Sequence, residues 1–302
     1  MEGGQLHTRQ FTPPGARGWA KVGACAERLL SYPARLGAFG GLELDAMSVF
    51  RRADLSPTRS LVVLPTYNEA ENVLILVEEI LALNVPDSPI GTLEILVVDD
   101  GSPDGTGALV RGAMASESHL HLIERAGKLG LGTAYLAGFA YGLEHGFDHI
   151  LTMDCDFSHK PSYLPDLIHG MTLHDMMIGS RYVPGGGIAN WPVHRRFLSS
   201  FANLYTRALL RLPTRDCTSG FRCYSRAVLE TIDTAAIKSS GYSFLEEMVF
   251  RVHRAGFQIG ETPILFEDRI RGASKINRAE ILRAALHVLS TALNPPKRNK
   301  RR

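Results

Sequence analysis

From residue 61 onward, short apolar runs alternate with stretches in which apolar residues recur every three or four positions. The runs have the length of buried strands, and the recurring stretches have the period of amphipathic helices. We predict strands at Leu61–Leu64, Leu93–Val98, Leu120–Glu124, His149–Met153 and Met176–Ile178. We predict helices at Glu71–Leu83, Thr106–Ser116 and Thr133–His145. This alternation predicts an α/β fold with a mostly parallel sheet flanked by helices, in a single domain over residues 59–277.

The two ends of the chain depart from this pattern. Residues 1–58 are rich in glycine and proline and are predicted to form an N-terminal extension. Residues 278–302 combine a helix at Arg278–Leu293 with a basic tail. One face of this helix is apolar and carries Ile281, Leu282, Ala285, Leu286, Leu289 and Leu293. Two interpretations are open: the helix and tail bind an anionic membrane surface, or the helix packs on the domain and the tail is solvated.

Composition narrows the class of protein. With 302 residues, of which 45% are hydrophobic and 21% charged, the chain is an ordinary globular protein. A formal net charge of +2 gives no reason to expect nucleic acid as a partner. The four cysteines, Cys25, Cys155, Cys217 and Cys223, have neither zinc-site spacing nor the density of a disulfide framework, which predicts reduced thiols. No apolar run is long enough for a membrane span.

Polar side chains follow several of the predicted strands. The fourth strand is followed by Asp154-Cys155-Asp156, and the first by Pro65-Thr66-Tyr67-Asn68-Glu69. The second is followed by Asp99-Asp100-Gly101-Ser102, and the fifth by Gly179-Ser180-Arg181-Tyr182. Ligands of such sheets lie outside the carboxyl ends of the strands, so these segments are expected to line one site. Aspartates at strand ends also cap turns, and the Asp-x-Asp pair taken alone does not separate the two roles.

The residue types at these strand ends suit a nucleoside diphosphate and a divalent cation. Asp154 and Asp156 offer the hard oxygen ligands that Mg²⁺ or Mn²⁺ prefers. Tyr67 can lie against a base, and Asp99 can accept a hydrogen bond from a base or ribose. Arg181 can neutralise a phosphate.

In their order along the chain, these motifs resemble the inverting nucleotide-sugar glycosyltransferases of family 2. Within that group the chain is most similar to dolichol-phosphate (polyprenol-phosphate) mannose synthases, over about Leu61 to Leu289. The similarity includes Lys128-Leu129-Gly130-Leu131-Gly132, Ser219-Gly220-Phe221-Arg222, Gly241-Tyr242-Ser243-Phe244 and Arg269-Ile270-Arg271-Gly272-Ala273-Ser274-Lys275. It implies a GT-A type, Rossmann-like fold. It also implies metal-dependent, inverting transfer of mannose from GDP-mannose to a polyprenyl phosphate.

Matched position by position, the resemblance implies a set of site residues. The nucleotide-sugar positions are Pro65, Tyr67, Glu69, Val97, Asp99, Asp154, Cys155, Asp156, Arg181, Arg269 and Lys275. The catalytic positions are Asp156, Arg181, Arg269 and Lys275. Asp154 and Asp156 match the metal ligands, and Ser158 stands where some members have a third, metal-contacting Gln. The chain also has Cys155 in place of the usual Ala and Leu245 in place of a common Gln.

The chemistry of lipid phosphate transfer agrees with this residue set. A diphosphate leaving group requires a hard cation. A lipid phosphate is already ionised near neutral pH, so the protein mainly has to position it, and Arg269, Arg271 and Lys275 suit that task. A soluble hydroxyl acceptor would instead need a general base, for which Glu247 is the candidate. Two more hypotheses stay open: transfer from UDP-glucose to the same lipid, and a non-catalytic, nucleotide-binding homologue.

The remaining polar segments and the membrane relation also have sequence-based expectations. Gly127–Gly132 lacks the spacing of a Walker loop and is predicted to be a turn before a helix. Arg222 and Glu247 are expected to form either a structural ion pair or part of the active site. The implied lipid acceptor predicts peripheral attachment at the cytoplasmic face of a membrane. A separate membrane-spanning subunit would suit a chain with no span of its own.

Overall fold

The structure is a computed structural model that describes residues 58–84, 88, 90–237, 239, 241–268 and 278–296. The N-terminal extension predicted at residues 1–58 lies outside the described residues, apart from Thr58. Arg269, Arg271, Lys275 and the basic tail at residues 297–302 also lie outside them. The expectations for these residues therefore remain predictions.

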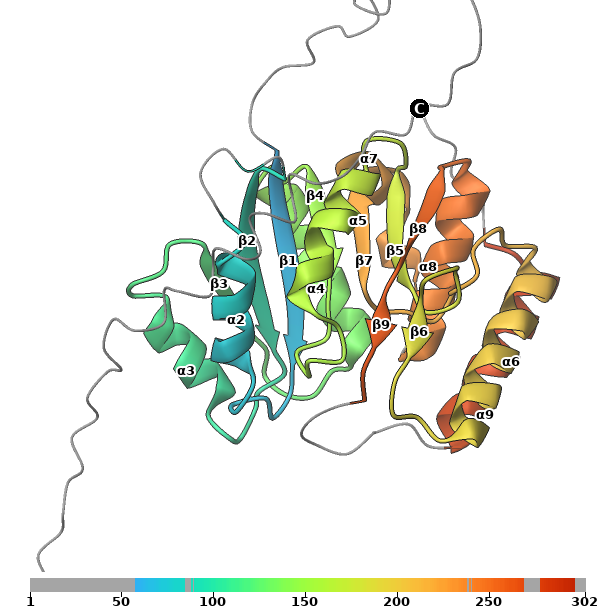
Figure 1. Cartoon of the computed structure of the whole chain (residues 1–302), viewed down its shortest axis with the longest axis horizontal. Coiled ribbons are helices and arrows are strands. Elements are labelled where there is room, and N and C mark those ends of the chain that lie inside the picture. Colours follow the sequence, from blue (N-terminus) through green and yellow to red (C-terminus); the bar gives the residue numbers. More distant parts are fainter. Residues whose placement is uncertain are drawn as a thin grey trace, which may run out of the picture. The chain divides into compact units, whose positions relative to one another are not determined.

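A seven-stranded sheet with the order β3-β2-β1-β4-β7-β5-β8 forms the centre of the fold (Figure 1). The strands are β1 (Arg59–Thr66), β2 (Thr92–Asp99), β3 (Leu120–Glu124), β4 (His149–Thr152), β5 (Met176–Ser180), β7 (Arg222–Ser225) and β8 (Ile259–Pro263). All neighbours pair in parallel except β7, which runs antiparallel to both β4 and β5. The predicted mostly parallel sheet is confirmed. Beside it, β6 (Gly187–Ile188) and β9 (Leu265–Phe266) form a two-stranded parallel ribbon.

Helices cover both faces of the sheet (Figure 1). They are α2 (Val73–Leu81), α3 (Thr106–Ala113), α4 (Leu131–Glu144), α5 (Leu164–Gly170), α6 (Val193–Leu210), α7 (Arg226–Thr231), α8 (Tyr242–Ala255) and α9 (Arg278–Leu293), with short 3₁₀ turns at Pro161–Tyr163 and Thr234–Ala236. Side chains of β1 alternate between the two layers. Leu61 and Val63 lie in one apolar cluster, with α4 and α8, and Val62 and Leu64 lie in another, with α2 and α5.

All the strands and helices predicted over residues 61–178 exist, and most of their ends differ by one to three residues. Helix α2, for example, begins at Val73 rather than at Glu71. The carbonyl of Glu69 accepts hydrogen bonds from the N–H groups of Asn72 and Val73, both at 2.9 Å, which closes a turn before the helix. The turn predicted at Gly127–Gly132 ends earlier, at Gly130, because α4 begins at Leu131 and includes Gly132.

Helix α4 lies directly on the sheet because glycines form its contact face. A Cβ atom on Gly138 would stand 2.4 Å from Cγ1 of Val63, and one on Gly142 would stand 2.6 Å from Cγ1 of Ile150. Both distances are shorter than real Cβ contacts allow. An alanine at either position would therefore force the helix or the strand side chains to shift.

Helices α6 and α9 lie side by side, and the hydroxyl of Tyr205 donates to the carbonyl of Ala285 at 3.1 Å (Figure 1). We call them the helix pair. Each exposes a stripe of large apolar side chains: Val193, Phe197, Phe201 and Leu204 on α6, and Leu282, Leu286, Leu289 and Leu293 on α9. The apolar face predicted for α9 thus points largely to solvent, while Val288 is buried against the domain.

Among the helices that the structure describes, none combines the length and the apolar character needed to cross a bilayer.

Candidate active site

The carboxyl ends of β1 and β2 form a hydrogen-bonded edge around Asp99. Thr66 and Asp99 are partners in the parallel register, and the Thr66 hydroxyl donates to Asp99 Oδ1 at 2.8 Å. Ser102 donates to the same carboxylate twice, from its hydroxyl at 2.6 Å and from its N–H at 2.9 Å. Asp99 is only 2% exposed, so these donors hold the carboxylate in one orientation at the strand end.

The loops after β1 and β2 are joined to each other through backbone donors. The N–H groups of Asn68, Glu69 and Ala70 donate to side chains of Ser102, Thr106 and Asp104, each at 3.0 Å. Asn68 has φ of +60°, so the chain turns sharply there. The two motifs predicted to line one site are thus in direct contact.

Two residues implied on the nucleoside side lie deeper in the strands. Pro65 is half-buried within β1 and pairs in register with Val98. Val97 is fully buried in an apolar cluster, so its side chain does not reach the edge. Tyr67 and Glu69, in contrast, stand in the loop and are half-buried.

Lys128, for which no individual role was predicted from the sequence, lies over the loop that follows β1. Lys128 places its Nζ atom 4.6 Å from the centroid of the Tyr67 ring. Its loop is held by Asp100, which accepts hydrogen bonds from the N–H groups of Leu129 and Gly130 at 3.1 and 3.2 Å and pairs with Arg125. In the sequence, the only sign of this arrangement is Asp100, the second aspartate after β2. Its role in holding the Lys128 loop is seen only in the structure, because the two loops are about 30 positions apart.

Asp154 stands just beyond β4 and is held from α4. The phenol of Tyr135, which is fully buried in the first turns of α4, donates to Asp154 Oδ1 at 3.1 Å. Burial raises the pKa of Tyr135 well above its usual value, and the neighbouring Asp154 charge raises it further, so the phenol keeps its proton. Asp154 itself is half-buried.

Asp156 is 4% exposed and accepts a hydrogen bond at Oδ1 from the N–H of Ser158 at 3.0 Å. The Ser158 hydroxyl lies 3.5 Å from Nδ1 of His159, and its role as a third metal ligand stays a prediction. Between the aspartates, the side chain of Cys155 is buried in the core, and burial raises its thiol pKa well above the usual value. For Cys155, backbone atoms rather than the thiol are therefore suited to contact a ligand.

The aspartate pair fits a divalent cation. Two carboxylates, each oriented by a protein donor, are hard ligands of the type that Mg²⁺ and Mn²⁺ take. Among the described residues, no group of three or more His, Cys, Asp and Glu side chains could hold a metal alone.

Arg181, at the end of β5, is held by a residue that no strand-end motif contains. Asp216 accepts hydrogen bonds from Nε and Nη2 of Arg181, both at 2.7 Å, and from its backbone N–H at 3.0 Å. Burial raises the pKa of Asp216, but the Arg181 charge and these hydrogen bonds outweigh it and hold the pKa below its usual value. This pair fixes the guanidinium and offsets part of its charge.

The start of α6 lies next to Arg181. The Arg181 guanidinium carbon is 6.0 Å from the centroid of the Trp191 ring, and that of Arg195 is 3.9 Å from the same ring. Nη1 of Arg195 also donates to both carboxylate oxygens of Asp268 at 3.1 Å, one residue before the segment at 269–277. Arg195 is thus a second cation on this side of the site, and only its contacts in three dimensions indicate it.

Of the two roles left open for Arg222 and Glu247, the ion pair between them does not form. Arg222 is fully buried and donates to the carbonyls of Cys217, Ser219 and Leu245 at 2.7 to 2.8 Å, which makes it a structural residue. Glu247 pairs instead with Arg251 and His287. Burial raises its pKa, but hydrogen bonds, among them those from these two partners, lower it to about 2.

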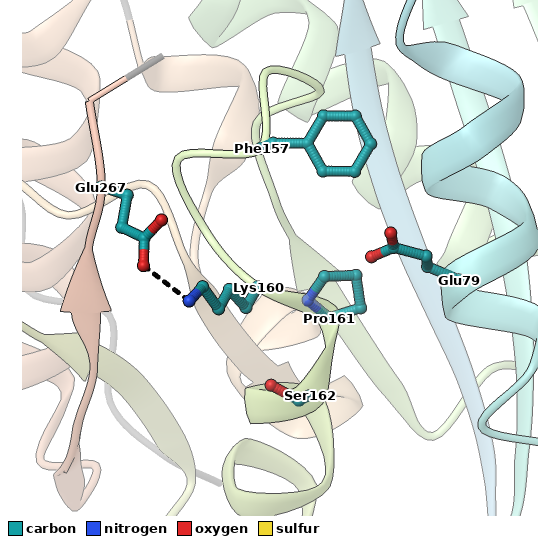
Figure 2. A pocket seen from close by; sticks show the side chains of 6 residues that line it. All are labelled: Glu79, Phe157, Lys160, Pro161, Ser162 and Glu267. Atoms are coloured by element: carbon teal, nitrogen blue, oxygen red, sulfur yellow. Dashed lines mark ion pairs between the residues drawn. The ribbon is translucent and has the colours of Figure 1, made fainter. Parts of the chain in front are cut away.

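A separate pocket of about 270 Å³ lies beside the loop that follows Asp156, and its lining residues are drawn in Figure 2. Its lining includes Phe157, Lys160 and Glu267, and the last two form an ion pair of 2.6 Å. Phe157 has φ of +60°, so the backbone adopts a left-handed conformation directly after Asp156. None of the residues predicted for the active site lines this pocket.

A mostly parallel sheet with carboxylates and hydroxyls at the ends of β1, β2 and β4 has the architecture of a nucleotide-binding α/β enzyme. The family model described as glycosyl transferase family 2 matches residues 61–233. The chain belongs to this family and is a glycosyltransferase.

Two curated relatives are similar over most of their length. The chain is 44% identical over 239 residues to the polyprenol monophosphomannose synthase of Mycolicibacterium smegmatis, covering 78% of this chain and 88% of that one. It is 43% identical over 230 residues to the undecaprenyl-phosphate mannosyltransferase of Micrococcus luteus, covering 76% and 92%.

Solved structures confirm the GT-A type fold. The glucosyl-3-phosphoglycerate synthase of Mycobacterium tuberculosis, in complex with Mn²⁺, UDP and glucosyl-3-phosphoglycerate, matches with a TM-score of 0.58 and 19% identity, over 86% of this chain and 88% of that one. The same enzyme with Mn²⁺, UDP and phosphoglyceric acid matches with a TM-score of 0.58 and 20% identity, over 80% of each chain.

Proposed function

We propose that this glycosyltransferase transfers mannose from GDP-mannose to a polyprenyl phosphate, with inversion at the anomeric carbon and with Mg²⁺ or Mn²⁺. The observation that carries the proposal is the identity of 43–44% to two relatives named for mannosyl transfer to polyprenyl carriers. The site agrees with it, because it combines oriented carboxylates with two neighbouring cations.

The donor would lie along the ends of β1, β2 and β4. Asp99 and Tyr67 would contact the nucleoside, with Lys128 beside them. Asp154 and Asp156 would hold the metal, with Ser158 as the third candidate ligand. The metal, when bound, neutralises charge on the departing diphosphate. This chain contributes preoriented oxygens, so little reorganisation is needed when the donor binds.

A phosphate acceptor suits the site better than a hydroxyl acceptor. A general base works best with a pKa near the operating pH. Glu247, the base candidate from the sequence, has a pKa lowered to about 2 and is paired with Arg251 and His287. An acceptor that is already ionised needs cations instead. Arg181 and Arg195 are the candidates, each held in place by an aspartate that offsets part of its charge, and Arg269 and Lys275 are the predicted additions from outside the described residues.

The helix pair supports attachment to the membrane that contains such an acceptor. Helix α6 begins beside Arg181, and its apolar stripe runs away from that point along the helix. Exposed apolar stripes on two adjacent helices are suited to the boundary between lipid headgroups and acyl chains. The buried free thiols Cys155, Cys217 and Cys223 suit the reducing cytoplasmic face.

A transfer assay tests the proposal. The purified chain is incubated with Mg²⁺, a polyprenyl phosphate and radiolabelled GDP-mannose or UDP-glucose, followed by extraction into organic solvent. We expect label in the organic phase with GDP-mannose. Label only with UDP-glucose would replace the donor, and no organic label with either donor would overturn the lipid acceptor.

The substitution Asp156→Asn tests catalysis at the predicted metal site. Removing one charged ligand is expected to lower transfer at least about 100-fold, because residues that only support a metal ligand already contribute about 10- to 100-fold and Asp156 would be a direct ligand. Thermal unfolding without metal serves as the control for folding, since Asp156 is buried. A transfer rate within about threefold of the wild-type rate would contradict the assignment of Asp156 as a metal ligand.

A further inference from the structure

We propose that Tyr135 is a positioning residue of the donor site: its phenol orients Asp154, so that the carboxylate presents its oxygens to a divalent cation in one direction. The inference rests on the proposed metal site and goes beyond it, since it adds a residue of α4 that neither the strand-end motifs nor the resemblance includes. Its geometry is a hydrogen bond of 3.1 Å from the Tyr135 hydroxyl to Asp154 Oδ1.

The ring of Tyr135 is held rigidly. The side chain is fully buried, and its ring stacks against Phe244 of α8 with centroids 6.0 Å apart. Helix α4 packs closely on β1 and β4 at Gly138 and Gly142, so the backbone that carries Tyr135 is held in place relative to Asp154. A donor supported in this way can hold a carboxylate in one orientation, as required of a residue behind a metal ligand.

Gly220 borders this hydrogen bond. A Cβ on Gly220 would lie 3.4 Å from the Tyr135 hydroxyl and 3.7 Å from each oxygen of Asp154, which is ordinary contact distance. Its carbonyl accepts from the Thr152 hydroxyl at 2.7 Å, two residues before Asp154. Glycine at this position therefore keeps a side chain away from both carboxylate oxygens.

The physical effect concerns the direction in which Asp154 offers its lone pairs. An ionised carboxylate has about four acceptor positions. The phenol occupies one on Oδ1 and limits rotation of the group, which sets where the other positions point. A plain core tyrosine would also pack on Phe244, but its hydroxyl would have no effect on metal affinity. Metal affinity therefore distinguishes a positioning role of Tyr135 from a role in core packing alone.

The substitution Tyr135→Phe removes only the hydroxyl, and Mn²⁺ titration followed by electron paramagnetic resonance in the presence of GDP measures the effect without any transfer reaction. We expect Mn²⁺ affinity to fall by about 10-fold, the lower end of the range for residues behind a metal ligand. The matched control is Tyr224→Phe, because Tyr224 is also a fully buried phenol but its oxygen accepts from Arg222 at 3.3 Å rather than binding Asp154. This control is expected to leave Mn²⁺ affinity unchanged.

A second variant tests the wall formed by Gly220. Gly220→Ala adds a methyl group at a contact distance that the fold accommodates, and it is expected to lower Mn²⁺ affinity by a similar factor by shielding Asp154. In an Asp154→Ala background, Tyr135→Phe is expected to have no further effect, because the two residues act as one unit. Thermal unfolding without metal accompanies every variant.

The outcomes separate this inference from the proposed function. Equal Mn²⁺ affinity of Tyr135→Phe and wild type overturns the inference, and transfer activity in the same preparation would leave the proposed function standing. Equal losses in Tyr135→Phe and Tyr224→Phe would indicate a general loosening of the core and also overturn it. Absence of Mn²⁺ binding by the wild type with both GDP and UDP would overturn both the positioning role and the metal assignment.

Discussion

We call the carboxyl ends of β1, β2 and β4 the donor edge, because the nucleotide-sugar donor is proposed to bind there. The donor edge differs from the helix pair, α6 and α9, in which side chains it buries and which it exposes. At the donor edge, Asp99 is 2% exposed and Asp156 4%, and protein donors orient both carboxylates. On the helix pair, Phe197 is 73% exposed and Leu293 71%. One region prepares charged groups before a ligand arrives, and the other leaves large apolar groups uncovered.

The difference suits the two kinds of partner that we propose for this protein. A nucleoside diphosphate is small, charged and strongly hydrated, so its recognition requires donors and acceptors that are fixed in advance. A lipid surface has no fixed atoms to recognise, and apolar area alone supplies most of the binding free energy. The hydrogen-bonded carboxylates therefore suit the proposed nucleotide-sugar donor, and the exposed apolar side chains suit the proposed membrane contact.

Replacing both Phe197 and Phe201 by Gln tests the helix pair and has the largest expected effect. Each phenylalanine that enters the lipid contributes roughly 1.5–3 kcal/mol, so binding to anionic phospholipid vesicles is expected to weaken at least about 100-fold. Flotation measures binding, and calorimetry with GDP checks that the donor edge is unaffected. The matched control is Leu173→Gln, which removes an apolar side chain that is 81% exposed but lies outside the helix pair. Equal flotation of the double variant and wild type would refute membrane contact by α6.

Glu246, buried beside the helix pair, provides the second test. Its Oε1 accepts from the Thr206 hydroxyl at 3.1 Å, and burial raises its pKa to about 7 despite that bond and the charges of His287 and Arg222. The folded state thus holds the proton more tightly than the unfolded state does. The contribution of this group to stability is highest below the ordinary pKa of 4.5 and falls as pH rises from there through about 7.

The substitution Glu246→Gln removes this titration. Its stability relative to wild type is expected to rise by about 2 kcal/mol between pH 5 and pH 8, measured by urea unfolding. Glu144→Gln, at an exposed position of α4, is the control and should show no such trend. If the difference in unfolding free energy between Glu246→Gln and wild type does not change with pH, the pKa of Glu246 is the same in the folded and unfolded states, which contradicts the prediction.

Lys128→Met gives the smallest expected effect and concerns the donor edge. Loss of an exposed cation next to Tyr67 is expected to weaken GDP binding by about fivefold, or about 1 kcal/mol. Calorimetry with GDP and with guanosine shows whether the loss depends on the diphosphate. Lys160→Met removes a lysine that pairs with Glu267 instead and serves as the control. Unchanged GDP affinity would show that Lys128 only covers the ring.

The donor edge was largely predictable from the sequence, because its chemistry is local. Asp99, Asp154 and Asp156 each stand at or just beyond the end of a strand, and parallel strands bring their carboxyl ends to one edge whatever the details of the loops. The predicted elements over residues 61–178 were confirmed for a similar reason, since period and length identify buried strands and amphipathic helices.

Partners that come from distant segments were not predictable. Asp216 pairs with Arg181 across 35 positions, and Tyr135 reaches Asp154 from a different element. The ion pair between Arg222 and Glu247, one of the two roles left open for them, does not form because three buried carbonyls satisfy the guanidinium. Such choices depend on packing in three dimensions, which a pattern along the chain does not contain.

The glycines of α4 have a consequence for how substitutions act at a distance. Glycine in a helix costs about 1 kcal/mol relative to alanine, so Gly138 and Gly142 weaken the helix that carries them. In return, the helix backbone at these two positions lies directly against the side chains of Val63 and Ile150. Gly138 lies one turn along from Tyr135, and alanine there would push the helix away from Val63. Gly138→Ala, normally a stabilising change in a helix, would therefore draw the Tyr135 phenol away from Asp154, which the added methyl group does not contact.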